Sequence, residues 1–279
     1  MTIRIVTDST CDLPVETIER FDIRVIPLYI HVGREEYLDG IDITRGEFYE
    51  RLPNYQEHPT TAVPSPVKFR ALYDALADEG ASQIISIHIS EALSAVVNVA
   101  RIAAEETTST TVSVFDSRQL SLGTGFMVET AAKMASVGHS LEEILHSLDS
   151  QIKRSHVFAA LDTLEFLKRS GRMNKYMANL GALLQIKPIM TMYDGTPGSE
   201  RVRTSERAMK RVVEMLAAVG SLEQLAFVHT HAPERVEKLR SLASHLLPQE
   251  KILTADITPV IGVHIGPGAV GFAAVGAKK

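Results

Sequence analysis

Short runs of β-branched and apolar residues alternate with helical patterns along the first half of the chain. The runs cover 3–6, 25–31, 84–88 and 112–115, and the helical segments cover 15–21, 66–78, 92–106 and 124–150, the last broken near Gly138. Strands that alternate with helices predict a parallel sheet covered by helices on both faces. We therefore expect an N-terminal α/β domain of this kind.

The second half shows a different order of elements. Its strand-like runs cover 156–161, 186–193, 222–230, 251–257 and 258–264, and its helical segments cover 163–168, 174–184, 205–219 and 233–246. The last two runs are too close for a helical crossover, which favours antiparallel pairing between them. We expect a C-terminal α/β domain with a mixed or antiparallel sheet. A chain of 279 residues suits two domains, predicted at 1–154 and 155–279.

Composition argues against several classes of protein. The formal net charge is −5, so no overall positive field attracts nucleic acid, and we expect no nucleic-acid partner. Cys11 is the sole cysteine, which excludes an intrachain disulfide and suits a reducing cytoplasm.

The first residues are typical of a strand and not of a signal peptide. His264 and a Gly-Pro-Gly sequence interrupt the most apolar stretch, 260–277, and argue against a membrane helix. We expect a cytoplasmic protein with at most transient membrane contact.

Polar turns follow three of the predicted strands, at 7–10, 86–90 and 115–117. In open α/β sheets, ligands bind beyond the carboxyl ends of the strands. Asp8 and Asp116 are candidates there, although aspartate is also a common helix N-cap. Both interpretations stay open.

The segment 53–66 contains four prolines and predicts a loop without regular structure, either a linker or a functional loop. Thr61 lies in it, just before a predicted helix. Hydroxyls and amides at a helix start can bind an anion.

Common catalytic and cofactor motifs are absent from the sequence or lack the right context. The segment 266–271 matches G-x-G-x-x-G, but too little chain follows for a dinucleotide fold, and a glycine turn between the last two strands is expected instead. His229 and His231 lack further ligands at standard spacing, so no metal site is expected. No nucleophile elbow or P-loop occurs, and no catalytic residue is predicted.

Two clusters carry further candidate residues. Ser94 lies at a strand-to-helix turn in 90–96, and His264 is embedded among apolar and glycine residues in 259–268. A lone histidine in such surroundings is usually a core residue. The two clusters together are more informative than either alone.

As a set, these segments resemble the DegV family of bacterial fatty-acid-binding proteins. The matching segments are 7–14, 61–65, 93–94, 116–118, 161–167, 171–172, 186–189, 203–204 and 264–268. Each motif is weak alone, but their order and spacing together are specific. The chain departs from the usual family pattern at Ala62, Ala95, Val96 and Ser170.

The resemblance implies a two-domain protein that buries one long-chain fatty acid at the domain junction, with no catalysis and no cofactor of its own. It implies a partner, an ATP-dependent fatty acid kinase that converts the bound carboxylate to an acyl phosphate. By the same resemblance, Thr61 and Ser94 hydrogen-bond the carboxylate and His264 joins their network. Arg172 is expected near the head group and Arg203 at the partner surface.

Two other functions stay open at this point. One is a small-molecule kinase or hydrolase that uses Asp8, Ser94 and His264; the other is a carrier for a different apolar acid or a regulator that senses acyl chains. The segments 161–167, 177–186 and 189–192 are rich in Leu, Ile and Met. They are candidates to surround an acyl tail or to form ordinary core.

Overall fold

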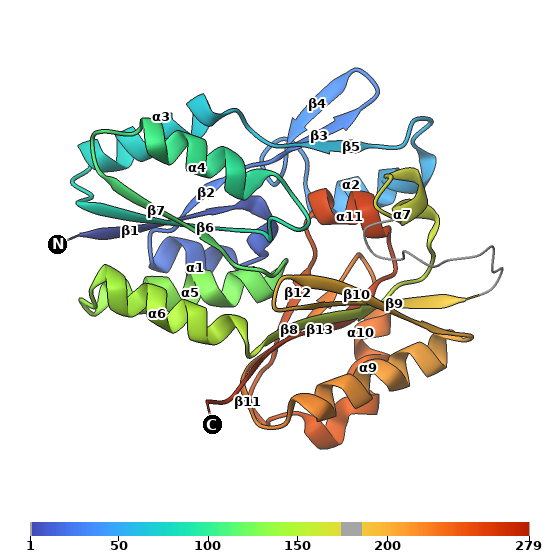
Figure 1. The fold of residues 1–279 in the computed structure, drawn as a ribbon. Helices are drawn as coiled ribbons and strands as arrows, with labels where there is room; N and C mark the ends of the chain where they lie inside the picture. Colours follow the sequence, from blue (N-terminus) through green and yellow to red (C-terminus); the bar gives the residue numbers. More distant parts are fainter. Residues whose placement is uncertain (1, 174–185, 279) are drawn as a thin grey trace.

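The computed structural model describes residues 2–173 and 186–278 of the protein (Figure 1). Its first sheet has four strands, all parallel, in the order β2-β1-β6-β7. The strands are β1 (Ile3–Asp8), β2 (Arg24–Ile26), β6 (Gln83–His88) and β7 (Thr111–Asp116). The predicted parallel sheet is therefore confirmed.

Helices cover both faces of this sheet, as predicted. On one face lie α3 (Pro66–Asp78) and α4 (Val96–Glu106), and on the other lie α1 (Val15–Arg20), α5 (Leu122–Ser136) and α6 (Leu141–Ile152) (Figure 1). The helix predicted at 92–106 begins four residues later, at Val96. Ser94 is thereby left in the loop that precedes the helix.

A small antiparallel sheet stands apart from the main one and has the order β4-β3-β5. It consists of β3 (Tyr29–Val32), β4 (Glu35–Leu38) and β5 (Thr60–Ala62), and α2 (Arg45–Arg51) lies between β4 and β5 in the chain. The prediction that 53–66 has no regular structure is wrong at β5, because Thr61 pairs with Ile30 of β3. The same prediction missed the 3₁₀ turn η2 (Leu52–Asn54).

The second sheet has six strands in the order β10-β9-β8-β13-β11-β12 and is mixed. All neighbouring strands run antiparallel except β11 and β12, which are parallel. The strands are β8 (Ser155–Ala160), β9 (Lys187–Tyr193), β10 (Thr196–Val202), β11 (Leu222–His229), β12 (Leu253–Asp256) and β13 (Val270–Gly276). This confirms the expected mixed α/β class.

The second half of the chain also forms helices in its described part. They are α7 (Glu165–Arg169), α9 (Ser205–Val219), α10 (Pro233–Ala243) with the 3₁₀ turn η3 (Ser244–Leu246), and α11 (Pro259–Ile265). The helix predicted at 174–184 lies outside the described residues. No helix in 2–173 or 186–278 has the length and apolarity needed to cross a membrane.

The strand predicted at 258–264 is wrong, and so is its antiparallel pairing with 251–257. These residues form α11, and β12 pairs in parallel with β11. Thr258 is the N-cap and Pro259 the first helical residue, a position where proline's fixed φ suits a helix. The glycine turn expected between two strands instead joins α11 to β13.

Helix α5 lies between the two large sheets (Figure 1) and joins them into one core. It packs on β1 and β6 of the first sheet and on β8, β11 and β13 of the second. Gly125 lets its backbone approach Cys11, since a β-carbon there would overlap the Cys11 carbonyl oxygen. A helix buried on most sides needs little amphipathicity, which explains why apolar and small residues dominate its sequence.

Candidate functional site

A cavity of about 470 Å³ opens where β1, β6 and β7 end, beside α11. Thr10, Ile89 and Leu120 line it, each in the turn that follows one of those strands. Its volume falls within the range of about 300–1,000 Å³ that is usual for ligand sites. Most of the wall is apolar: Leu28, Ala62, Val63, Ile89, Leu93, Ala95, Leu120, Val260, Ile261 and Ile265.

Thr61 and His264 meet in the wall of this cavity. Thr61 lies at the centre of β5, and His264 lies in the last turn of α11. Thr61 Oγ1 and His264 Nε2 are 3.2 Å apart and share a hydrogen bond. A hydroxyl both donates and accepts, so this bond forms with either imidazole tautomer. His264 Nδ1 is buried, with no hydrogen-bond partner among the described residues.

The imidazole of His264 is held in its neutral form. Burial, with the nearby charges of Arg172 and His58, lowers the pKa of His264 to about 3. At neutral pH this side chain is thus a polar but uncharged donor or acceptor in an apolar wall.

Ser94 lines the same cavity, from the loop between β6 and α4. Its Oγ accepts a hydrogen bond of 3.4 Å from the backbone N–H of Val96, the first residue of α4. The start of α4 thus faces the neighbourhood of Ser94, and the positive end of its dipole favours a negative group there. Thr61, Ser94 and His264 thus line one cavity.

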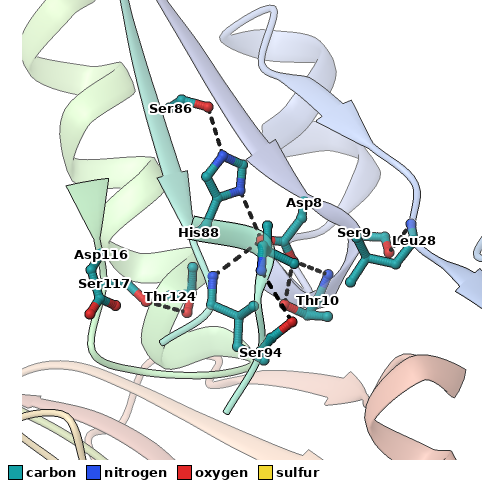
Figure 2. A network of polar contacts seen from close by, with 12 residues as sticks. Asp8, Ser9, Thr10, Leu28, Ser86, His88, Ser94, Asp116, Ser117 and Thr124 are labelled. Carbon is teal, nitrogen blue, oxygen red and sulfur yellow. Dashed lines mark hydrogen bonds and ion pairs between the residues drawn. The ribbon is translucent and has the colours of Figure 1, made fainter. Parts of the chain in front are cut away.

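A buried network anchors the loops that form the cavity wall (Figure 2). Asp8 is fully buried, and its Oδ1 accepts hydrogen bonds from the N–H and the hydroxyl of Thr10 at 3.0 and 2.5 Å. Its Oδ2 lies 3.0 Å from His88 Nδ1 and accepts from the Ile89 N–H at 3.1 Å. Thr10 and Ile89 both line the cavity, so Asp8 fixes two parts of its wall.

The network continues away from the cavity. His88 Nε2 lies 2.7 Å from Ser86 Oγ, which lies 2.8 Å from Tyr73 Oη. Burial alone would raise the pKa of Asp8, but the hydrogen bond and charge of His88, with bonds from Thr10 and Ile89, hold it below its usual value. Asp8 is therefore an ionised structural acceptor.

Asp8 does not join Ser94 and His264 in a common reacting group. It is not among the described residues that line the cavity. Thr10 occupies one of its carboxylate oxygens, and His88 and Ile89 occupy the other. Asp116 plays a similar local role: it accepts from the backbone N–H groups of Arg118 and Glu91 at 2.8 and 3.4 Å. The capping interpretation thus describes Asp8, the N-cap of the 3₁₀ turn η1 (Ser9–Cys11), whereas Asp116 binds backbone N–H groups of two loops and is not a helix N-cap.

The two candidate arginines occupy different places. Arg172 lines the cavity and donates a hydrogen bond of 2.8 Å to the Ser170 carbonyl. Arg203 is exposed between β10 and α9 and is not among the described residues of the cavity. Glu91 also lines the cavity, but it pairs with Arg101 at 2.8 Å. Arg172 is thus the cation that an acidic ligand in the cavity can approach.

Sequence reasoning missed a large part of the wall. Val260, Ile261 and Ile265 of α11 line the cavity because this segment is a helix and not a strand. Thr10 belongs to a recognised polar turn but was not selected. The segments 161–167 and 189–192 contribute buried core residues and are not among the described lining residues. The segment 177–186 falls outside the described residues except for Ile186.

The histidine pair at the end of β11 has local protein partners. His229 Nδ1 accepts a hydrogen bond of 3.2 Å from the Ala232 N–H and lies 3.5 Å from Asp256. His231 lies 3.7 Å from the same carboxylate. Among residues 2–173 and 186–278, no group of three potential metal ligands occurs.

Comparison with known proteins assigns the family. The family model described as "Uncharacterised protein, DegV family" matches residues 2–277. A DegV domain-containing protein of Listeria innocua is 33% identical over 274 residues, which are 97% of each chain.

Two solved structures are also similar over nearly their full length. One is titled for the fatty acid binding of a DegV family protein from Thermus thermophilus; it is 36% identical with a TM-score of 0.89. The other is DegV from Bacillus subtilis, described as a fatty acid binding protein, which is 31% identical with a TM-score of 0.90. Each match covers 99% of this chain and 100% of the other. Sequence and fold agree, and the chain belongs to the DegV family.

Proposed function

We propose that this protein binds one long-chain fatty acid in the cavity described above, with the carboxylate at Thr61, Ser94 and His264. The observation that carries the proposal is the Thr61–His264 hydrogen bond in the wall of an otherwise largely apolar cavity. Fatty acid binding by the similar proteins of Thermus thermophilus and Bacillus subtilis supports it.

The head group needs donors because a carboxylate that loses water without replacement partners loses several kcal/mol, as an order of magnitude. Ser94 supplies a hydroxyl, and the Thr61–His264 pair supplies one further donor, because the hydrogen bond between these two residues already uses one of their protons. The remaining proton lies on the Thr61 hydroxyl in one tautomer of the neutral imidazole and on His264 Nδ1 in the other. Arg172 adds positive charge at the cavity wall. These groups hold the acid mainly through neutral donors and leave its oxygens free of a tight ion pair.

The acyl chain gains stability from the apolar wall. Burial is worth roughly 0.8 kcal/mol per methylene, so a tail of about fifteen such groups gains on the order of 10 kcal/mol before opposing terms. Loss of translational freedom and ordering of the tail offset a large part of this gain. The remainder supports a carrier that retains its ligand yet releases it to a partner.

A carrier role, without catalysis or a cofactor of its own, completes the proposal. An ATP-dependent fatty acid kinase phosphorylates the bound carboxylate to an acyl phosphate, and exposed Arg203 contributes to the surface that meets this kinase. The neutral head-group site suits a carboxylate that must attack a phosphoryl group. The protein works in the cytoplasm, in keeping with its single buried cysteine.

The proposed domains are 1–154 and 155–279, with the ligand at their junction. The second sheet begins at Ser155. Support for a junctional site comes from Arg172 and α11, which line the cavity together with residues of the first half.

Native mass spectrometry of the purified protein, followed by lipid extraction, tests the proposal. We expect one copurified long-chain fatty acid per chain, and rebinding of such an acid after delipidation. Protein that neither carries nor rebinds a fatty acid, and that hydrolyses ATP or an ester alone, would overturn it in favour of the enzyme alternative.

A further inference from the structure

The chain enters α11 through three residues that are each fastened to the first half of the protein. The Asp256 carbonyl accepts a hydrogen bond from the Arg45 guanidinium, and the Ile257 carbonyl accepts one of 2.9 Å from Tyr49 Oη. Thr258 uses both of its donors: its N–H donates to Asp12 Oδ1 at 2.9 Å, and its hydroxyl donates to Asp39. Two carboxylates from the first half thus hold the residue that caps α11.

Asp12 is the centre of this junction. Its side chain is 0% exposed, and it accepts from Ser121 Oγ at 2.6 Å as well as from Thr258. Arg45 lies 3.1 Å from it. One carboxylate therefore joins the loop before α5, helix α2 and the start of α11.

The junction holds more negative than positive charge. Asp12 and Asp39 are both buried, and Arg45 is the cation that faces them. Burial raises the pKa of Asp12 to about 6, although Arg45, Ser121 and Thr258 oppose the rise and Asp39 adds to it. Burial likewise raises the pKa of Asp39, against its bonds to Ser9 and Thr258.

Other titratable groups face the same junction. The groups that interact electrostatically with Asp12, Asp39 or Arg45 include Asp8, Cys11, Tyr49, His229 and Asp256, and Asp256 in turn lies beside His229 and His231. Burial raises the pKa of the Cys11 thiol to about 12, so this group stays neutral. Burial, opposed by the charge of Asp256, lowers the pKa of His229.

The position of α11 sets the position of His264. The helix packs on α2, β3 and β5 with little freedom, because a β-carbon at Gly262 would overlap the Tyr49 hydroxyl. Its other end stops at Gly266, whose φ is +72° and where a β-carbon would overlap the Phe166 ring. A shift at Thr258 is thus transmitted along a short, tightly packed helix to the imidazole.

We propose that Asp12 and Asp39 are positioning residues for the ligand site: in their ionised state they hold Thr258 and α11 so that His264 meets Thr61, and protonation loosens the site. A protonated carboxyl group turns one acceptor oxygen into a donor and competes for the bonds to Thr258 and Ser121. Mild acid would then promote ligand release. The role of these residues in retention rests on the proposed function; their effect on His264 does not.

Asp12→Asn tests this, because an asparagine copies the protonated shape and tolerates the positive φ of 55° found at Asp12. Asp78→Asn, at the exposed end of α3, is the matched control. We expect the wild type and the control to bind a labelled fatty acid about tenfold more weakly at pH 5.5 than at pH 7.5, equivalent to one lost hydrogen bond. The Asp12→Asn variant should bind the labelled fatty acid weakly at both pH values.

A second readout needs no ligand. The imidazole nitrogen resonances of His264 should move between pH 7.5 and 5.5 in the wild type and should match the low-pH position throughout in Asp12→Asn. Protonation of His264 itself does not occur in this window, since its pKa is about 3. Unchanged resonances in Asp12→Asn would overturn the inference even if no fatty acid binds. A wild type that does not bind would overturn the proposed function alone.

Two measurements distinguish a positioning role from a general role in folding: the thermal stability of Asp12→Asn and the recovery of binding in Thr258→Ser. The folded-state pKa of Asp12, about 6, lies above its ordinary value of 3.8, so its ionisation lowers the stability of the fold as the pH rises through that range. Asp12→Asn should thus keep its thermal midpoint at pH 7.5. Thr258→Val should weaken binding and Thr258→Ser should restore it. A loss of stability that parallels the loss of binding, or Thr258→Val with wild-type affinity, would refute the positioning role.

Discussion

Thr61 Oγ1 lies 3.2 Å from His264 Nε2, although 203 residues separate the two in the sequence. The two side chains meet because β5 pairs with β3 in the small sheet, and α11 of the second half packs against both of these strands. Its placement in the wall of the cavity makes it the centre of the proposed head-group site. The predictions below test this pair and the structure that supports it.

Thr61→Ala and Ser94→Ala should each weaken fatty acid binding by about 1–3 kcal/mol, because a buried polar group loses its partner. Thr60→Ala is the matched control, since Thr60 is exposed on the same strand. Isothermal titration of delipidated protein measures the effect. Wild-type affinity in both site variants would rule out the head-group assignment.

His264 should make stability depend on pH. Its folded pKa, about 3, lies below the ordinary value of 6.5, so the unfolded chain takes up the proton more readily. The contribution of His264 is thus fully present above about 6.5 and is lost as the pH falls toward 3. Urea unfolding between pH 4 and 7 should show a steeper rise for the wild type than for His264→Asn. Parallel curves would contradict a neutral, buried imidazole; His139→Asn, an exposed site, is the control.

Asp8→Asn should lower the free energy of unfolding more than Asp12→Asn does, although both residues are buried. The four donors around Asp8 favour its ionised form, and an amide nitrogen would face two of them, at a cost of about 3 kcal/mol. Because the pKa of Asp8 is lowered in the fold, the stability that the ionised carboxylate contributes is present above pH 3.8. This contribution is lost as the pH falls below that value. Chemical denaturation at pH 7 measures both variants. Equal losses would show that the two carboxylates have the same role.

Gly266→Ala should reduce stability by about 1–3 kcal/mol, because the added carbon overlaps Phe166. Gly138→Ala isolates the backbone strain, since Gly138 also has a positive φ but open space around it. Phe166→Leu should recover part of the loss in the double variant, with an interaction energy of about 0.5–3 kcal/mol. Additive losses in the double-mutant cycle would show that this overlap is relieved elsewhere.

Arg203→Ala should leave fatty acid binding unchanged and slow phosphorylation by a partner kinase by roughly tenfold, because an exposed charge at an interface mainly affects association. Arg34→Ala, at the exposed β3–β4 turn, is the control. Acyl phosphate formation with purified kinase measures the effect. Equal rates for both variants would remove Arg203 from the partner surface.

The parallel sheet and its helices could be predicted because their periodic patterns are strong and local. Helix α2 was missed although Thr44 and Glu47 form a capping box that the sequence displays. Strand β10 was missed because its Pro, Gly and charged residues are poor strand formers, and pairing with β9 stabilises it. Tertiary contacts outweigh local preference there.

The error at 258–264 was avoidable in part. Pro259 after Thr258 and the glycine at 266 are helix start and stop signals, but apolar β-branched residues between them are also typical of a strand. Thr61, Ser94 and His264 were selected through a family resemblance, and the sequence alone did not show that they share a cavity. Asp12 and Asp39 gave no signal, because their importance depends on Thr258, more than 200 residues away.

The crossing of α11 into the first half also bears on synthesis of the protein. Most of the cavity wall belongs to the first 152 residues, which are translated first. The imidazole of His264 is not yet present at that stage. His264 arrives only after nearly the entire second sheet has been translated. The wall of the cavity is therefore complete only after α11 has been translated.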